Sequence, residues 1–84
     1  MPSHSDLPGD LSRRKLLRAL SRIGFTISTV GGKGDHFKVT WPRTQKSVTV
    51  DGEMVRKDQL RYILKEIEMY SNGDVTWERI KREL

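Results

Sequence analysis

The sequence predicts a two-layer α+β domain in which a helix, three antiparallel strands and a second helix follow one another along the chain. Apolar residues recur at helical spacing over residues 16–23 and again over residues 60–67. Over residues 25–50 they alternate with polar residues instead, which is typical of half-buried strands. The 84 residues suit one small domain, because a chain this short hides only about 60–65% of its extended surface on folding.

The first helix is expected to begin after a short leader. Residues 1–10 hold two of the three prolines and no periodic apolar pattern, so we expect a disordered leader there. Ser12 is a residue type that caps helices, and Gly24 is one that ends them. The apolar side of this helix consists of Leu16, Leu17, Ala19, Leu20 and Ile23. Its other side carries Arg14, Arg18 and Arg22 and is therefore positive.

Alternating patterns predict three strands over residues 25–29, 36–41 and 47–50. The glycine-rich segment Gly31 to Gly34 is expected to form the first turn, and such short connections favour an antiparallel meander. We expect both helices on one face of this sheet. The other face is predicted to be polar and to carry His36, Lys38, Thr40, Ser47 and Thr49.

The second helix is expected to follow a loop over residues 51–55. Its apolar stripe consists of Leu60, Ile63, Leu64 and Ile67, flanked by Lys57, Arg61 and Lys65. The segment from Ser71 to Asp74 ends it, which bounds the principal domain at residues 11–74. Residues 75–84 are expected to form a short helical extension of the same domain. One hypothesis is that its Trp77 and Ile80 cover Tyr62 or Met69.

Composition excludes several classes of protein. The chain has no cysteine, which excludes a disulfide framework, a thiolate zinc site and a cysteine nucleophile. The longest apolar run, Tyr62-Ile63-Leu64, is far shorter than a membrane span or a signal-peptide core. The cytoplasm is therefore the expected compartment.

Positive charge is concentrated in the first half of the domain. The formal net charge is +5, and residues 11–50 contain nine Lys and Arg residues against the single acid Asp35. Such a field attracts polyanions, and nucleic acid is the most common partner for it.

His36 is the candidate catalytic residue, because it is the only imidazole inside the predicted domain. Cleavage of RNA without a metal requires a base for the ribose 2′-hydroxyl, an acid for the leaving oxygen and cations for the phosphate charge. An imidazole, with an unperturbed pKa of about 6.5, serves in either proton role. Lys38 or Lys33 would supply positive charge, and Gly34 would let the backbone approach a phosphate. The alternative is that His36 is an ordinary surface residue.

Three segments together resemble a known family. They are Gly32-Lys33-Gly34-Asp35-His36-Phe37-Lys38 after a leucine-rich helix, then Ser47-Val48-Thr49-Val50, then Lys57 to Lys65. Over roughly residues 13–67 the chain is similar to the HicA (YcfA-like) toxins, the mRNA interferases of type II toxin–antitoxin systems. The resemblance implies a fold like that of double-stranded-RNA-binding domains, cleavage of mRNA without a cofactor, and a HicB-like antitoxin that covers the active site. His36 alone matches the catalytic histidine of the family.

The sequence thus predicts an RNA endonuclease in which His36 transfers a proton and Lys33, Gly34 and Lys38 contact phosphate. RNA would be steered by Arg14, Arg18, Lys57 and Arg61. The second proton-transfer group stays open between Lys38, Thr40 and a water molecule. One alternative is a non-catalytic RNA-binding module of the same fold. Another is an interaction protein that docks a partner through its polar sheet face, its exposed apolar residues or its tail.

Overall fold

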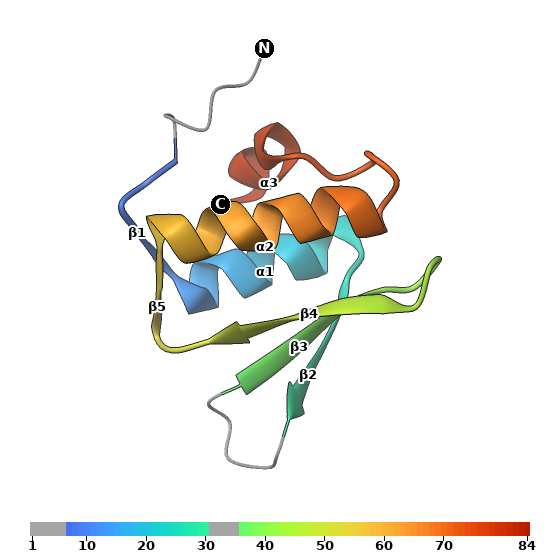
Figure 1. Cartoon of the computed structure of the whole chain (residues 1–84), viewed down its shortest axis with the longest axis horizontal. Helices are drawn as coiled ribbons and strands as arrows, with labels where there is room; N and C mark the ends of the chain where they lie inside the picture. Colours follow the sequence, from blue (N-terminus) through green and yellow to red (C-terminus); the bar gives the residue numbers. More distant parts are fainter. Residues whose placement is uncertain (1–6, 31–35) are drawn as a thin grey trace.

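A computed structural model of the chain describes residues 7–30 and 36–84. The elements follow in the order β1 (Asp10–Ser12), α1 (Arg13–Ile23), β2 (Thr26–Val30), β3 (His36–Trp41), β4 (Lys46–Asp51), β5 (Met54–Arg56), α2 (Lys57–Tyr70) and α3 (Trp77–Glu83). Strands β2, β3 and β4 form an antiparallel sheet in that order, and the helices lie on one side of it (Figure 1). This is the predicted α-β-β-β-α arrangement, like that of double-stranded-RNA-binding domains, with an added C-terminal helix.

The sheet has one covered and one open face, because side chains alternate along each strand. Val39 of β3 lies opposite Val48 of β4, and both are buried under the helices. Lys38 lies opposite Thr49, and both are exposed. The predicted alternation along β3 and β4 is thereby confirmed.

Helix α1 begins and ends at the residues that its sequence predicts. The hydroxyl of Ser12 accepts a hydrogen bond from the Lys15 amide at 3.4 Å and caps the first turn. Gly24 ends the helix at a φ of 131°, which favours glycine, and its amide donates to the Leu20 carbonyl at 3.1 Å.

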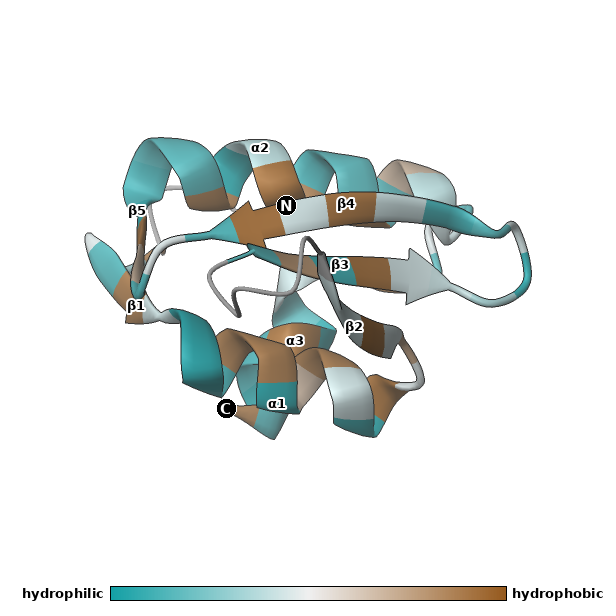
Figure 2. Cartoon of the chain, turned by 90° about the horizontal axis from the view of Figure 1, so that it is seen from below, coloured by the Kyte–Doolittle hydropathy of each residue, from teal (hydrophilic) through white to brown (hydrophobic). Residues whose placement is uncertain are grey.

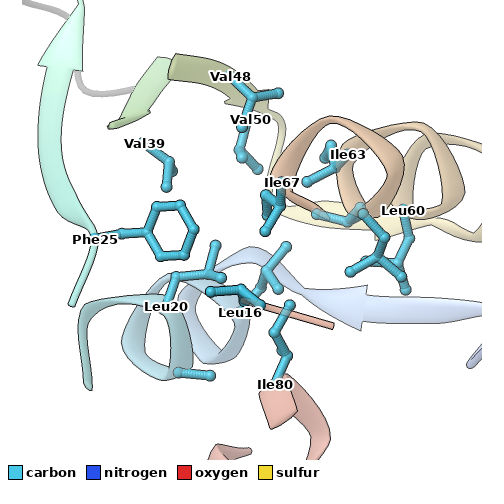
Figure 3. Close-up of a cluster of buried hydrophobic side chains, with 14 of the residues drawn as sticks. Leu16, Leu20, Phe25, Val39, Val48, Val50, Leu60, Ile63, Ile67 and Ile80 are labelled. Atoms are coloured by element: carbon cyan, nitrogen blue, oxygen red, sulfur yellow. The ribbon is translucent and has the colours of Figure 1, made fainter. Parts of the chain in front are cut away.

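The core lies between the sheet and the helices. Leu16 and Leu20 of α1, Ile67 of α2 and Val39 of the sheet belong to one buried cluster (Figure 3). The apolar segments of α1 and α2 are turned toward the strands, and their polar segments face outward (Figure 2). Each fully buried Leu, Ile or Val contributes roughly 1.5–3 kcal/mol to folding. Packing against the helices therefore fixes which face of the sheet is covered, and the opposite face is exposed to solvent.

Two expectations near the chain start and after β4 are wrong. The loop expected over residues 51–55 is shorter, because Met54 and Val55 belong to β5, which pairs antiparallel with β1 and sets Leu11 opposite Val55. Leu7, placed in a disordered leader, is 5% exposed and belongs to the core. Burial of these apolar side chains stabilises the pairing and offsets entropy lost when residues 7–12 become ordered. Residues 1–6 of the expected leader lie outside the described residues.

Helix α3 is part of the core, but it does not cover the residues proposed from sequence. Ile80 is fully buried and packs toward Leu16 of α1 (Figure 3). Tyr62 and Met69 remain 62% and 58% exposed, so the hypothesis that the tail covers them is wrong. The turn before α3 is held by Ser71, whose hydroxyl accepts the Val75 amide at 3.0 Å. Across residues 7–30 and 36–84, no helix has the length and apolar character needed to cross a membrane.

Candidate active site

His36 is the first residue of β3, and the alternation along this strand puts its exposed side chain on the open face of the sheet, opposite to the face of the buried Val39. Asp51, the last residue of β4, lies directly opposite it. Nδ1 of His36 and Oδ1 of Asp51 are 2.5 Å apart, and the two side chains are 54% and 53% exposed. An ionised carboxylate can only accept hydrogen bonds, so Nδ1 is the donor. The nitrogen left for other contacts is Nε2.

Backbone structure brings the two side chains together. The β3–β4 register sets His36 opposite Asp51, and Gly52, with a φ of 78°, then turns the chain out of the sheet. From the first turns of α2, the Gln59 side-chain amide donates to the Asp51 carbonyl at 3.5 Å. Asp51 is therefore tied to both β3 and α2.

The remaining polar residues of the open face lie along the same two strands. Lys38 is exposed, two residues from His36 and on the same face. Thr40 lies farther along β3, opposite Ser47. Lys33 and Gly34, expected to contact phosphate, lie outside the described residues.

Several cations lie where the two long helices begin. Both α1 and α2 start at the end of the molecule where β3 begins and β4 ends (Figure 1). Arg14 is exposed in the first turn of α1. Lys57 begins α2 and is half-buried, and Arg61 is exposed one turn later. Three of the four residues expected to steer RNA are therefore at the His36 end.

Arg18 does not belong to this group. With Lys15 and Arg22 it lines a shallow hollow beside Glu83 and Leu84 at the end of α3. The Arg22 guanidinium donates to the Glu83 carbonyl at 3.2 Å. The structure thus places Arg18 on the α3 side of α1, away from the open sheet face.

Sequence reasoning missed Arg13. Its guanidinium lies 4.6 Å from the centre of the Phe37 ring, a cation–π contact that fastens the first turn of α1 to the beginning of β3. One signal was available, because Arg13, Arg14 and Lys15 follow one another at a helix start. Cations there oppose the helix dipole, at a cost of roughly 0.3–1 kcal/mol each.

Two tyrosines on the outer side of α2 have shifted pKa values. Glu66 raises the pKa of the Tyr62 phenol, first by a hydrogen bond and then by its negative charge. Loss of solvent raises the pKa of Tyr70, with a smaller effect of Glu66.

Within residues 7–30 and 36–84, no three His, Cys, Asp or Glu side chains gather in a way that could hold a metal ion.

Comparison with known proteins identifies the family. The model of the HicA toxin family, described as the HicA toxin of bacterial toxin-antitoxin, matches residues 13–69. The match covers well over half of the chain, including His36 and Asp51, and leaves out β1 and α3. Comparisons with curated proteins and with solved structures give no match. The chain belongs to the HicA toxin family of bacterial toxin–antitoxin systems.

Proposed function

We propose that this toxin is an endoribonuclease that cleaves mRNA and that His36 is its catalytic residue. The observation that carries the proposal is the position of His36: its imidazole is exposed on the open sheet face, with Nδ1 bonded to Asp51 and Nε2 available. Family membership supports the same assignment. The first turns of α1 and α2 add cations at the same end of the molecule.

The proposed chemistry uses the ribose as the nucleophile. Nε2 of His36 takes the proton of the 2′-hydroxyl, and the 2′-oxygen attacks the adjacent phosphorus. The bond to the 5′-oxygen breaks, and that oxygen receives a proton from Lys38, Thr40 or water. The products are a 2′,3′-cyclic phosphate and a 5′-hydroxyl, and no metal or cofactor is required. Lys38, Lys33 and the backbone at Gly34 would stabilise the charge on the phosphate.

RNA would be drawn to this end by its charge. We expect Arg14, Lys57 and Arg61, which lie in the first two turns of α1 and α2, to contact the phosphate backbone of the RNA, and Arg18 to add to the long-range field. A HicB-like antitoxin that neutralises the toxin would have to present an acidic surface to the same cations.

The test is an RNA cleavage assay with the wild-type chain and with His36→Ala. A structured mRNA fragment is incubated in the presence of a chelator, and the products are separated by length. Wild type is expected to cut, and His36→Ala to cut at least about 100-fold more slowly, the lower end of the contribution of general acid–base catalysis. Both proteins are first compared by circular dichroism.

A second substrate controls for the mechanism. An RNA that carries a single 2′-deoxyribose at the mapped cleavage site should not be cut there, because its nucleophile is missing. Equal cutting by both proteins would assign the activity elsewhere and overturn the role of His36. If neither protein cuts but both bind the RNA, the chain is the non-catalytic RNA-binding module instead.

A further inference from the structure

The contact between His36 and Asp51 determines which imidazole nitrogen is free to react. We propose that Asp51 is a positioning residue that keeps the proton of the neutral ring on Nδ1 and turns Nε2 toward the open sheet face. The proposal rests on the proposed nuclease function. It adds a second residue to the site and assigns that residue a role.

The neutral histidine side chain has two tautomers. A neutral imidazole carries its proton on either nitrogen, and the partner of one nitrogen decides which form is present. Asp51 can only accept, so its Oδ1, 2.5 Å from Nδ1, selects the form with the proton on Nδ1. The lone pair then lies on Nε2, where a 2′-hydroxyl can reach it. After proton transfer, the same carboxylate faces the newly formed imidazolium and stabilises its charge.

Two contacts of its backbone help to position Asp51 for this role. Its backbone is opposite His36 in the β3–β4 ladder, and its carbonyl accepts the Gln59 side chain. The carboxylate therefore reaches the imidazole from a strand end with two attachments.

The contact between His36 and Asp51 contributes little to the stability of the fold. Both side chains are more than half exposed, and exposed ion pairs typically contribute only about 0–1 kcal/mol. Replacement of Asp51 should therefore leave the free energy of unfolding almost unchanged, although the His36 ring loses its partner on Nδ1. A purely structural residue would instead change the stability when it is replaced.

The first measurement is independent of catalysis. His4→Gln removes the only other histidine, and the chain is then labelled with ¹⁵N in the His36 ring. Nitrogen chemical shifts are recorded at about pH 9, well above the unperturbed imidazole pKa of about 6.5. Without Asp51 the ring should prefer the proton on Nε2, as free histidine does. We expect the Nδ1–H form in the parent, the Nε2–H form in Asp51→Ala, and the parent pattern in the control Glu53→Ala, which removes an acid from the same turn.

The second measurement is single-turnover RNA cleavage by the same variants. Asp51→Ala should cut about 10–100-fold more slowly with unchanged RNA affinity, part of the effect expected for a general base. Glu53→Ala should cut at the parent rate, and Asp51→Glu should recover part of the loss.

The outcomes separate this proposal from the proposed function. If the parent cleaves RNA but Asp51→Ala keeps the Nδ1–H form and the parent rate, the positioning role is wrong and the nuclease assignment stands. If the parent shows the Nδ1–H form but cuts no RNA, the nuclease assignment fails and the catalytic role of Asp51 fails with it.

Discussion

Among single residues, Trp77 stands out in the described part of the structure because its side chain lacks a hydrogen bond. Its indole Nε1 is buried and finds no hydrogen-bond partner there. A buried donor without a partner costs roughly 1–3 kcal/mol. Replacement of the half-buried Trp77 by Phe removes that donor and sacrifices about 1 kcal/mol of apolar burial.

Trp77→Phe is therefore expected to leave the free energy of unfolding unchanged or to raise it by up to about 2 kcal/mol. Urea denaturation of the two proteins measures this difference. Trp77→Ala, which removes the ring entirely, is the control and should be destabilising. A decrease of about 2 kcal/mol or more in Trp77→Phe would contradict the reasoning, because it would exceed the burial that the smaller ring gives up.

The residues of the candidate site were only partly predictable. Alternation along residues 36–41 placed His36 on the polar face without knowledge of the fold. The contact with Asp51 was not foreseen, because the predicted strand ended at Val50 and the structural one ends one residue later. Contacts between strands depend on register, and the length of the turn after Trp41 sets the register. Arg13 was missed for a related reason, since its partner Phe37 lies on another element.

Among the elements, the predictable ones have their own local signals. Helix α1 has a cap, an apolar stripe and a terminal glycine, and each signal lies within the helix. Strands β1 and β5 have three residues each, which is too short for an alternation to be recognised. Their pairing depends on the burial of Leu11 and Val55, which are far apart in the sequence. Such a contact becomes visible only in three dimensions.

Helix α3 lies outside the family match, yet its packing indicates that it stabilises the whole domain. Ile80 is fully buried in the core cluster, and α3 packs on α1. Truncation of a buried Ile to Ala typically costs roughly 2–5 kcal/mol. In a domain of this size, about 2 kcal/mol corresponds to a fall in Tm of about 8 °C or more.

Ile80→Ala should therefore lower the Tm by at least about 8 °C in a thermal melt followed by circular dichroism. Glu78→Ala, an exposed change on the same helix, should shift it by less than about 4 °C. Equal melting of Ile80→Ala and wild type would mean that α3 is a separate appendage.

At the scale of the whole molecule, the fold divides the positive charge between two regions. One lies at the starts of α1 and α2, at the end of the molecule where β3 begins, and includes Arg14, Lys57 and Arg61. The other lies between α1 and α3, where Arg18 and Arg22 line a hollow with the end of the chain. Sequence periodicity placed Arg14, Arg18 and Arg22 on one stripe. Because α3 packs on α1, Arg18 and Arg22 lie beside the end of α3, whereas Arg14 does not line that hollow.

This division predicts how RNA binding responds to salt. For single-stranded RNA, the slope of log Kobs against log salt concentration falls in magnitude by about 0.7 for each phosphate that the protein no longer neutralises. Binding is measured by fluorescence anisotropy in a His36→Ala background, so that the RNA stays intact. Arg14→Ala, combined with Arg61→Ala, should reduce the slope by about 1.4, while Arg18→Ala should leave it nearly unchanged. The reverse pattern would place the RNA on the α1–α3 side, far from His36, and would contradict a catalytic site on the open sheet face.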